Sequence, residues 1–215
     1  MCKVLGRLAY LLVVTGCFLT VGAVFNTTPP FNECPQIGLS PSCAVLYVFN
    51  ANGTVSVYGD ASVSPYDGSE DTLVGVLNNS SQTIPSLTLS GVGVNGIPIF
   101  GLEGDGICTY APFTGSGYCS GAYYKTDPGD YAGPNQTITN ISSDQKTGTI
   151  NFIGGLAPGA ATYFSLEDRL STSTPPVVGG NVTTTPAPPS VLLMLTAMAG
   201  LILYQGRRWF VQMFA

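Results

Sequence analysis

The chain has 215 residues, of which only 9% are charged, against about 25% in a typical soluble domain. Glycine and proline make up about a fifth of it, which excludes a helical bundle, and the absence of histidine excludes Ser-His-Asp triads, Cys-His pairs and histidine-ligated zinc. All twelve acidic residues but only three of the seven basic ones lie between residues 8 and 206. Such an acidic surface repels phosphate, so we expect no nucleic-acid partner.

Residues 1–23 are typical of a signal peptide. Lys3 and Arg7 precede an apolar run, and Val21-Gly22-Ala23 offers small residues for cleavage after Ala23. Two alternatives stay open. The segment Val14-Thr15-Gly16-Cys17 resembles a bacterial lipobox, in which Cys17 would carry the lipid, and the apolar run would also serve as an uncleaved helical anchor.

An N-terminal extension, residues 24–42, leads into a predicted all-β domain at residues 43–170. Short β-rich runs alternate with polar turns, which is typical of an antiparallel β-sandwich. Asn50-Ala51-Asn52-Gly53 predicts a hairpin turn between the first two strands. We expect strands at residues 45–49, 54–58, 72–77, 84–89, 137–141, 149–153 and 161–166.

Four cysteines fall within the exported part: Cys34, Cys43, Cys108 and Cys119. An even number in an exported domain predicts two disulfides, for which three pairings exist. We favour Cys34–Cys43 and Cys108–Cys119, because each pair joins near neighbours and closes a small loop. Neither pair has the spacing of a zinc knuckle.

Acidic residues cluster in three glycine-containing loops, at 67–71, 103–106 and 127–130. Carboxylates in such loops suit calcium, which takes six to eight oxygen ligands. The alternative is that Asp-Gly and Asp-Pro-Gly simply form turns on an acidic surface. The loops supply these candidate calcium ligands: Asp67, Glu70, Asp71, Asp127 and Asp130.

Four tyrosines lie close together in the sequence: Tyr118, Tyr123, Tyr124 and Tyr131. Aromatic rings at this density on exposed loops suit stacking against a sugar or a protein partner, and the alternative is packing within the sandwich. No carboxylate spacing singles out a glycosidase pair, and no serine has a base to activate it. We therefore predict no enzyme and no catalytic residue, with calcium as the one cofactor to test.

The C-terminal region begins with a Pro/Thr-rich linker, residues 171–189, which is extended and unsuited to a helix. Residues 191–204 are uncharged and mostly apolar and predict a transmembrane helix. Arg207 and Arg208 follow it, so the positive-inside rule places the β domain outside the membrane.

This order of segments at residues 190–215 resembles a PEP-CTERM sorting signal. Pro188, Pro189 and Ser190 stand at the family's Pro-Glu-Pro-Ser position, with Pro188 in place of the glutamate, and Arg207-Arg208 form its arginine pair. The resemblance implies a bacterial surface protein processed by a membrane transpeptidase, an exosortase, and linked to extracellular polysaccharide. Residues 70–80 and 155–160 are similar to a strand and a corner of Ig-like modules on bacterial surfaces, which implies an Ig-like sandwich.

Seven Asn-x-Ser/Thr sequons leave a eukaryotic glycoprotein as a rival interpretation. The hypothesis we favour is an exported, membrane-anchored envelope protein that is structural or adhesive, and that processing releases to the surface. Its alternative is a calcium-dependent carbohydrate-binding module.

Overall fold

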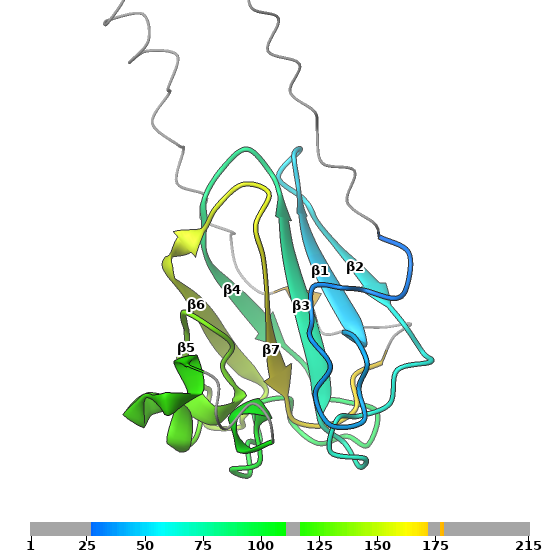
Figure 1. Cartoon of the computed structure of the whole chain (residues 1–215), viewed down its shortest axis with the longest axis vertical. Helices are drawn as coiled ribbons and strands as arrows, with labels where there is room; N and C mark the ends of the chain where they lie inside the picture. Colours follow the sequence, from blue (N-terminus) through cyan, green and yellow to red (C-terminus); the bar gives the residue numbers. More distant parts are fainter. Residues whose placement is uncertain (1–26, 111–116, 172–176, 179–215) are drawn as a thin grey trace, which may run out of the picture.

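A computed structural model describes residues 27–110, 117–171 and 177–178. The described chain is mostly β, with two four-stranded sheets packed face to face and short 3-10 turns gathered at one end (Figure 1). The first sheet has the order β2-β1-β3-β7 and the second β5-β6-β4-β8. The first comprises β1 (Val45–Asn50), β2 (Val55–Gly59), β3 (Thr72–Asn79) and β7 (Ala161–Leu166), and the second β4 (Ile84–Ser90), β5 (Gln136–Thr139), β6 (Thr147–Leu156) and β8 (Val177–Val178).

The predicted hairpin is confirmed. β1 and β2 pair antiparallel, and the turn between them is closed by hydrogen bonds from Asn50 N to Thr54 O (2.8 Å) and from Gly53 N to Asn50 O (3.0 Å). Gly53 has a φ of 80°, which glycine adopts without steric cost. The sequence turn signal and the strand boundaries therefore agree.

The prediction of an entirely antiparallel sandwich is wrong at one place. β3 pairs with β1 in parallel, with Val45 opposite Val74. β2 occupies the other side of β1 after the hairpin, so the chain crosses through residues 60–71 before β3 enters the sheet beside β1. A crossover of this length allows parallel pairing, which a tight turn does not.

Alternate residues of β1 and β3 face two different cores. Tyr47 and Val74 lie in the core between the two sheets. Leu46 and Leu73 lie in a second core on the opposite face of the first sheet. Strands buried on both faces read as continuous apolar runs, which explains why these segments show no alternation in the sequence.

The second core is closed by the segment before β1. Phe31 and Ile37 are fully buried there, and the Cys34–Cys43 disulfide ties the segment to the start of the sheet. Figure 1 shows this segment, in blue, crossing the face of the first sheet. Residues 31–43 thus pack as part of the domain.

The Asn-rich turn after β3 and the Pro-Gly corner before β7 lie beside each other. Asn78 N donates to Ala160 O (2.9 Å), and Gly159 N donates to Asn78 O (2.7 Å). The buried Asn78 side chain also donates to Gln82 O and to Leu156 O. One asparagine therefore joins the two sheets at this end of the sandwich.

The last strand was not predicted. β8 falls within the predicted linker and pairs antiparallel with β4, with Leu89 opposite Val178. The signal peptide (1–23), the transmembrane segment (191–204) and the residues of the sorting motif lie outside the described residues. Within the described ranges, no helix is long and apolar enough to cross a membrane.

Candidate functional site

Three carboxylates meet where β3 begins and β7 ends. Asp71 immediately precedes β3, Glu167 immediately follows β7, and Asp105 comes from the loop between β4 and β5. One oxygen of each lies within 4.8 Å of the others. Because Thr72 pairs with Leu166 in the antiparallel β3–β7 ladder, the next position of the same register places Asp71 and Glu167 opposite each other.

Asp71 is fully buried, and neither of its carboxylate oxygens has a well-formed hydrogen bond among the described residues. The buried Tyr66 hydroxyl, which donates to Ser165 Oγ (3.3 Å), is the polar group that lies close to the carboxylate. The main chain of Asp71 is engaged, because its N–H donates to Asp67 Oδ1 (3.0 Å) and its carbonyl accepts from Tyr66 N (3.1 Å). The backbone thus fixes the position of a side chain whose oxygens lack a well-formed hydrogen bond, an arrangement that costs free energy when the group is charged.

One tyrosine hydroxyl links the other two carboxylates. The Tyr131 hydroxyl lies 2.7 Å from Glu167 Oε2 and 2.5 Å from Asp105 Oδ1, and it accepts a hydrogen bond from Glu103 N (3.3 Å). A phenol has a single hydrogen to donate. It therefore satisfies only one of its two carboxylate neighbours fully.

Burial raises the pKa of Asp71 to about 8, the nearby Tyr66 hydroxyl opposes the rise, and the negative charges of Glu167, Asp105 and Asp67 add to it. Burial also raises the pKa of Glu167 to about 7, while the hydrogen bond from Tyr131 opposes the rise. In both groups the main cause is burial, which disfavours the ionised form, and the neighbouring carboxylates add to it.

Two other acidic residues, Asp67 and Glu70, lie next to the three carboxylates but do not belong to the group. Asp67 is satisfied within its own turn, because its carboxylate accepts hydrogen bonds from the main-chain N–H groups of Ser69, Glu70 and Asp71. Glu70 has a raised pKa from desolvation and from the charges of Asp67 and of other nearby carboxylates. The 67–71 and 103–106 loops therefore converge, and they concentrate negative charge around the three carboxylates.

Asp127 and Asp130 form a pair on the third acidic loop, which lies against the 103–106 loop, but neither belongs to the group of three carboxylates. Asp130 is buried, and its Oδ1 has no hydrogen-bond partner in the described part of the chain. Burial, followed by the charge of Asp127, raises its pKa to about 6. The structure thus divides the five predicted calcium ligands between two places, and only Asp71 belongs to the group of three.

Asp168 has a different role from that of Glu167 beside it. Its backbone is left-handed, with a φ of 63°. Its carboxylate accepts hydrogen bonds from the main-chain N–H groups of Asn95 (3.1 Å), Ile97 (3.1 Å) and Arg169 (2.6 Å), and from the Asn95 side chain (2.7 Å). This fully buried carboxylate holds the 93–97 loop against the end of β7.

The predicted tyrosine surface is largely used within the fold. Tyr131 is fully buried and has no ring face open to a ligand. Tyr123 accepts a hydrogen bond from Ile138 N (2.7 Å) and donates to Ile138 O (3.3 Å), and Tyr124 donates to Gln136 O (3.2 Å). These hydroxyls thus satisfy main-chain groups of β5, an outer strand of its sheet.

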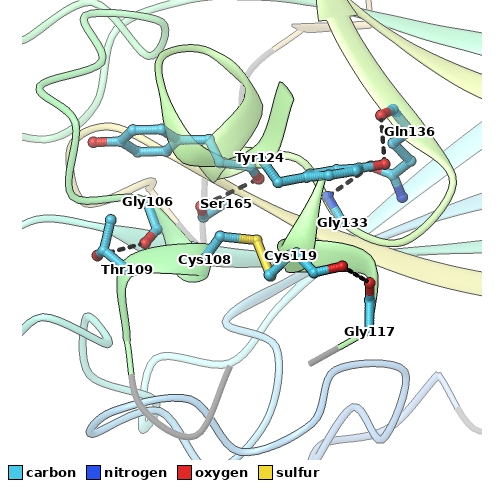
Figure 2. Close-up of a disulfide and its surroundings, with 11 residues drawn as sticks. Gly106, Cys108, Thr109, Gly117, Cys119, Tyr124, Gly133, Gln136 and Ser165 are labelled. Carbon is cyan, nitrogen blue, oxygen red and sulfur yellow. Dashed lines mark hydrogen bonds between the residues drawn. A yellow bond between two sulfur atoms is a disulfide. The ribbon is translucent and has the colours of Figure 1, made fainter. Parts of the chain in front are cut away.

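Tyr118 packs edge to face on Tyr124, with ring centroids 5.4 Å apart. Figure 2 shows Tyr124 extending toward Gln136, above the Cys108–Cys119 disulfide. That disulfide joins two 3-10 turns, η1 (Ile107–Thr109) and η3 (Tyr118–Ser120). Both favoured cysteine pairings are therefore confirmed, and the tyrosines form a packed cluster at the disulfide. Stacking of a sugar on the half-buried Tyr118, Tyr123 and Tyr124 stays a prediction.

Two hollows of the described surface have no carboxylate in their lining. One, of about 300 Å³, is lined by Val63, Thr72, Leu170 and neighbouring residues. Another, of about 280 Å³, lies at β6 and β7 and includes Phe152 and Leu156. No carboxylate lines either of them, so neither hollow offers an acidic pair to a bound sugar.

Asp105 and Glu167 were not among the predicted calcium ligands, and Tyr131 was predicted only as part of the tyrosine surface. Glu167 follows a buried strand, outside the three acidic loops, with only Asp168 as an acidic neighbour, and its partners lie about 60 and 100 residues earlier in the sequence. The sequence feature that could have identified Glu167 is its position directly after a predicted β-strand, because the end of a strand lies beside the loops of neighbouring strands.

Comparison with known proteins gives no match: no family model matches the chain, and neither does a curated protein or a solved structure.

Proposed function

We propose that this protein is an exported, non-catalytic domain of the cell envelope, tethered through its C-terminal tail, with a structural or adhesive role. The observation that carries the proposal is the presence of two disulfides, Cys34–Cys43 and Cys108–Cys119, within one small β domain. Disulfides persist in oxidising compartments and are rare in the cytosol. The signal-peptide pattern of residues 1–23 supports the same compartment.

The tail supplies the tether in this proposal. Residues 191–204 form the membrane span, and Arg207 and Arg208 hold the C-terminal side of it inside. By its resemblance to a PEP-CTERM signal, the motif Pro188-Pro189-Ser190 is the site at which an exosortase-like transpeptidase acts. The β domain, with an Ig-like arrangement of strands, then faces the extracellular polysaccharide.

The absence of catalysis in this proposal is supported by the placement of the acidic residues. Asp71 and Glu167 are buried beside each other, which leaves no room between them for a scissile bond. Glycosidases place their two carboxyl groups on either side of a sugar in an open cleft. The surface hollows described above contain no carboxylate. An adhesive or structural role needs none of this chemistry.

Intact mass spectrometry of the native protein, from membrane and medium fractions of the source cell, tests the proposal. We expect a chain that begins near residue 24 and lacks the hydrogens lost in forming two disulfides. A chain ending near Pro189 would show tail processing, and a membrane-bound chain with its full C-terminus would show a simple tail anchor. A soluble cytoplasmic form with its N-terminus intact and four free thiols would refute the proposal.

The matched control is a variant with Arg207 and Arg208 replaced by alanine. It should leave the disulfides intact, because the β domain is unchanged, while the protein is lost from the membrane fraction or fails to be processed. If this variant is anchored and processed like the native chain, the tail has no part in its localisation.

A further inference from the structure

Two buried acidic residues lie opposite each other across neighbouring strands. Asp71 and Glu167 are the first positions beyond the β3–β7 ladder, and both are almost completely buried. Like charges directly opposite on adjacent strands destabilise a sheet. A third carboxylate, that of Asp105, joins them within 4.8 Å, so an additional positive group is needed to balance this site when it is ionised.

The unpaired oxygens show where that group would lie. Neither oxygen of the fully buried Asp71 side chain has a well-formed hydrogen bond among the described residues, and the one hydrogen of the nearby Tyr66 hydroxyl is shared with Ser165 Oγ (3.3 Å). Buried polar atoms are almost always paired, and each exception needs a specific explanation. The Tyr131 hydroxyl, with one hydrogen for two carboxylates, leaves a second acceptor only partly satisfied.

We propose that Asp71, Asp105 and Glu167 bind a calcium ion. One oxygen from each of the three carboxylates lies within 4.8 Å of the others, so all three can reach one cation, whose oxygen ligands lie about 2.3–2.6 Å from the ion in calcium sites. Carboxylate oxygens favour calcium over zinc or copper, which prefer nitrogen and sulfur ligands. Asp105, the most exposed of the three, provides the side from which the ion and its water ligands enter.

A bound ion would join three segments that are far apart in the sequence. Asp71 belongs to the loop before β3, Asp105 to the long connection before β5, and Glu167 to the end of β7. Calcium would therefore stabilise this end of the sandwich. This inference does not depend on the proposed localisation, because it concerns only residues of the β domain.

Terbium luminescence provides a direct test in the full-length protein. Terbium occupies calcium sites and is excited by energy transfer from a nearby tyrosine, and Tyr131 contacts two of the three ligands. We expect luminescence that calcium displaces. We also expect calcium at about a hundredfold excess over its Kd to raise the Tm by roughly 5–10 °C relative to a chelator.

The variants Asp71→Asn and Glu167→Gln keep the shape of each side chain and remove one charge. Each should weaken calcium binding about tenfold or more, because affinity depends on the number of charged ligands. Asp71→Asn should also fold without calcium at least as well as the native chain, since it removes a buried carboxyl group whose ionisation the fold disfavours. Asp144→Asn, in an exposed turn, is the matched control and should bind calcium unchanged.

Each alternative result overturns the proposal. If calcium leaves the Tm unchanged and displaces no terbium luminescence, the negative charge of these carboxylates is neutralised by protonation or by the surrounding protein, without a metal ion. Native affinity in Asp71→Asn would show that the ion binds elsewhere. Loss of binding in Asp130→Asn with full binding in Asp71→Asn would place the site at the Asp127–Asp130 pair instead.

Discussion

The Asp168 carboxylate provides the sharpest test of how the domain is held together. We consider three substitutions: Asp168→Asn, Asp168→Gly and Asp168→Ala. All three disrupt the carboxylate that accepts four hydrogen bonds from Asn95, Ile97 and Arg169. They differ in how well each residue tolerates the left-handed backbone, with its φ of 63°, which asparagine and glycine adopt more readily than alanine does.

The structure sets the expected size of each effect. The four donors belong to exposed residues, so water replaces part of each lost bond, and a loss of about 0.5–1 kcal/mol per bond applies. Asp168→Gly should therefore lower the free energy of unfolding by about 2–4 kcal/mol. Asp168→Ala should lose about 1–2 kcal/mol more, because alanine is strained in the left-handed region. Asp168→Asn should lose the least, since its amide oxygen still accepts.

Urea denaturation of the full-length protein, followed by circular dichroism without reductant and with a calcium chelator, measures these differences. The chelator keeps any effect on the neighbouring Glu167 out of the comparison. If the glycine and alanine variants have equal free energies of unfolding, the backbone at this position is not strained. If all three variants match the native chain within about 0.5 kcal/mol, the carboxylate does not hold the 93–97 loop.

Three further predictions concern other parts of the domain. Replacing Cys108 and Cys119 together by serine should lower the free energy of unfolding by about 3 kcal/mol, measured by urea denaturation, and an unchanged midpoint would show that the disulfide adds no stability. Burial raises the pKa of Asp130 to about 6, so the folded state is favoured when this carboxyl is protonated. The contribution of Asp130 to the free energy of unfolding is therefore complete below about pH 4 and is lost as the pH rises through 6. Asp130→Asn should therefore lose less stability than the native chain between pH 4 and 7 in thermal melts, and parallel curves would contradict the assignment. Gly75→Ala would place a methyl group 2.5 Å from Cys43 Sγ and should lower the free energy of unfolding by about 1–3 kcal/mol, because the second core has no space for it. A Tm equal to that of the native chain would show that the side chains of this core rearrange around the methyl group.

Most strands could be predicted because their signals are local. The apolar run of β1 and the Asn-Gly turn after it lie within a few residues of each other, and β7 was predicted with its observed bounds. The parallel pairing of β1 with β3 could not be predicted, because the choice of a neighbouring strand depends on contacts far apart in the sequence. β8 was missed because two valines in a Pro/Thr-rich segment carry no strand signal of their own.

The same reasoning explains what was found and missed at the carboxylate site. Asp71 was recognised because it belongs to a dense acidic loop, whereas Glu167 joins it only through the register of β3 and β7. Tyr131 could not be distinguished from Tyr123 or Tyr124 by type or spacing, yet it alone is buried in the core. Burial of one residue among several similar ones is a property of the whole fold.

The contact between Tyr123 and β5 has a consequence for self-association. The outer strand of a sheet presents main-chain groups that invite a second molecule to extend the sheet. Here the Tyr123 hydroxyl engages both the N–H and the carbonyl of Ile138, so a neighbouring copy finds those two groups already occupied. A domain with this edge resists strand-to-strand polymerisation on that side, and crowded copies would remain separate molecules there.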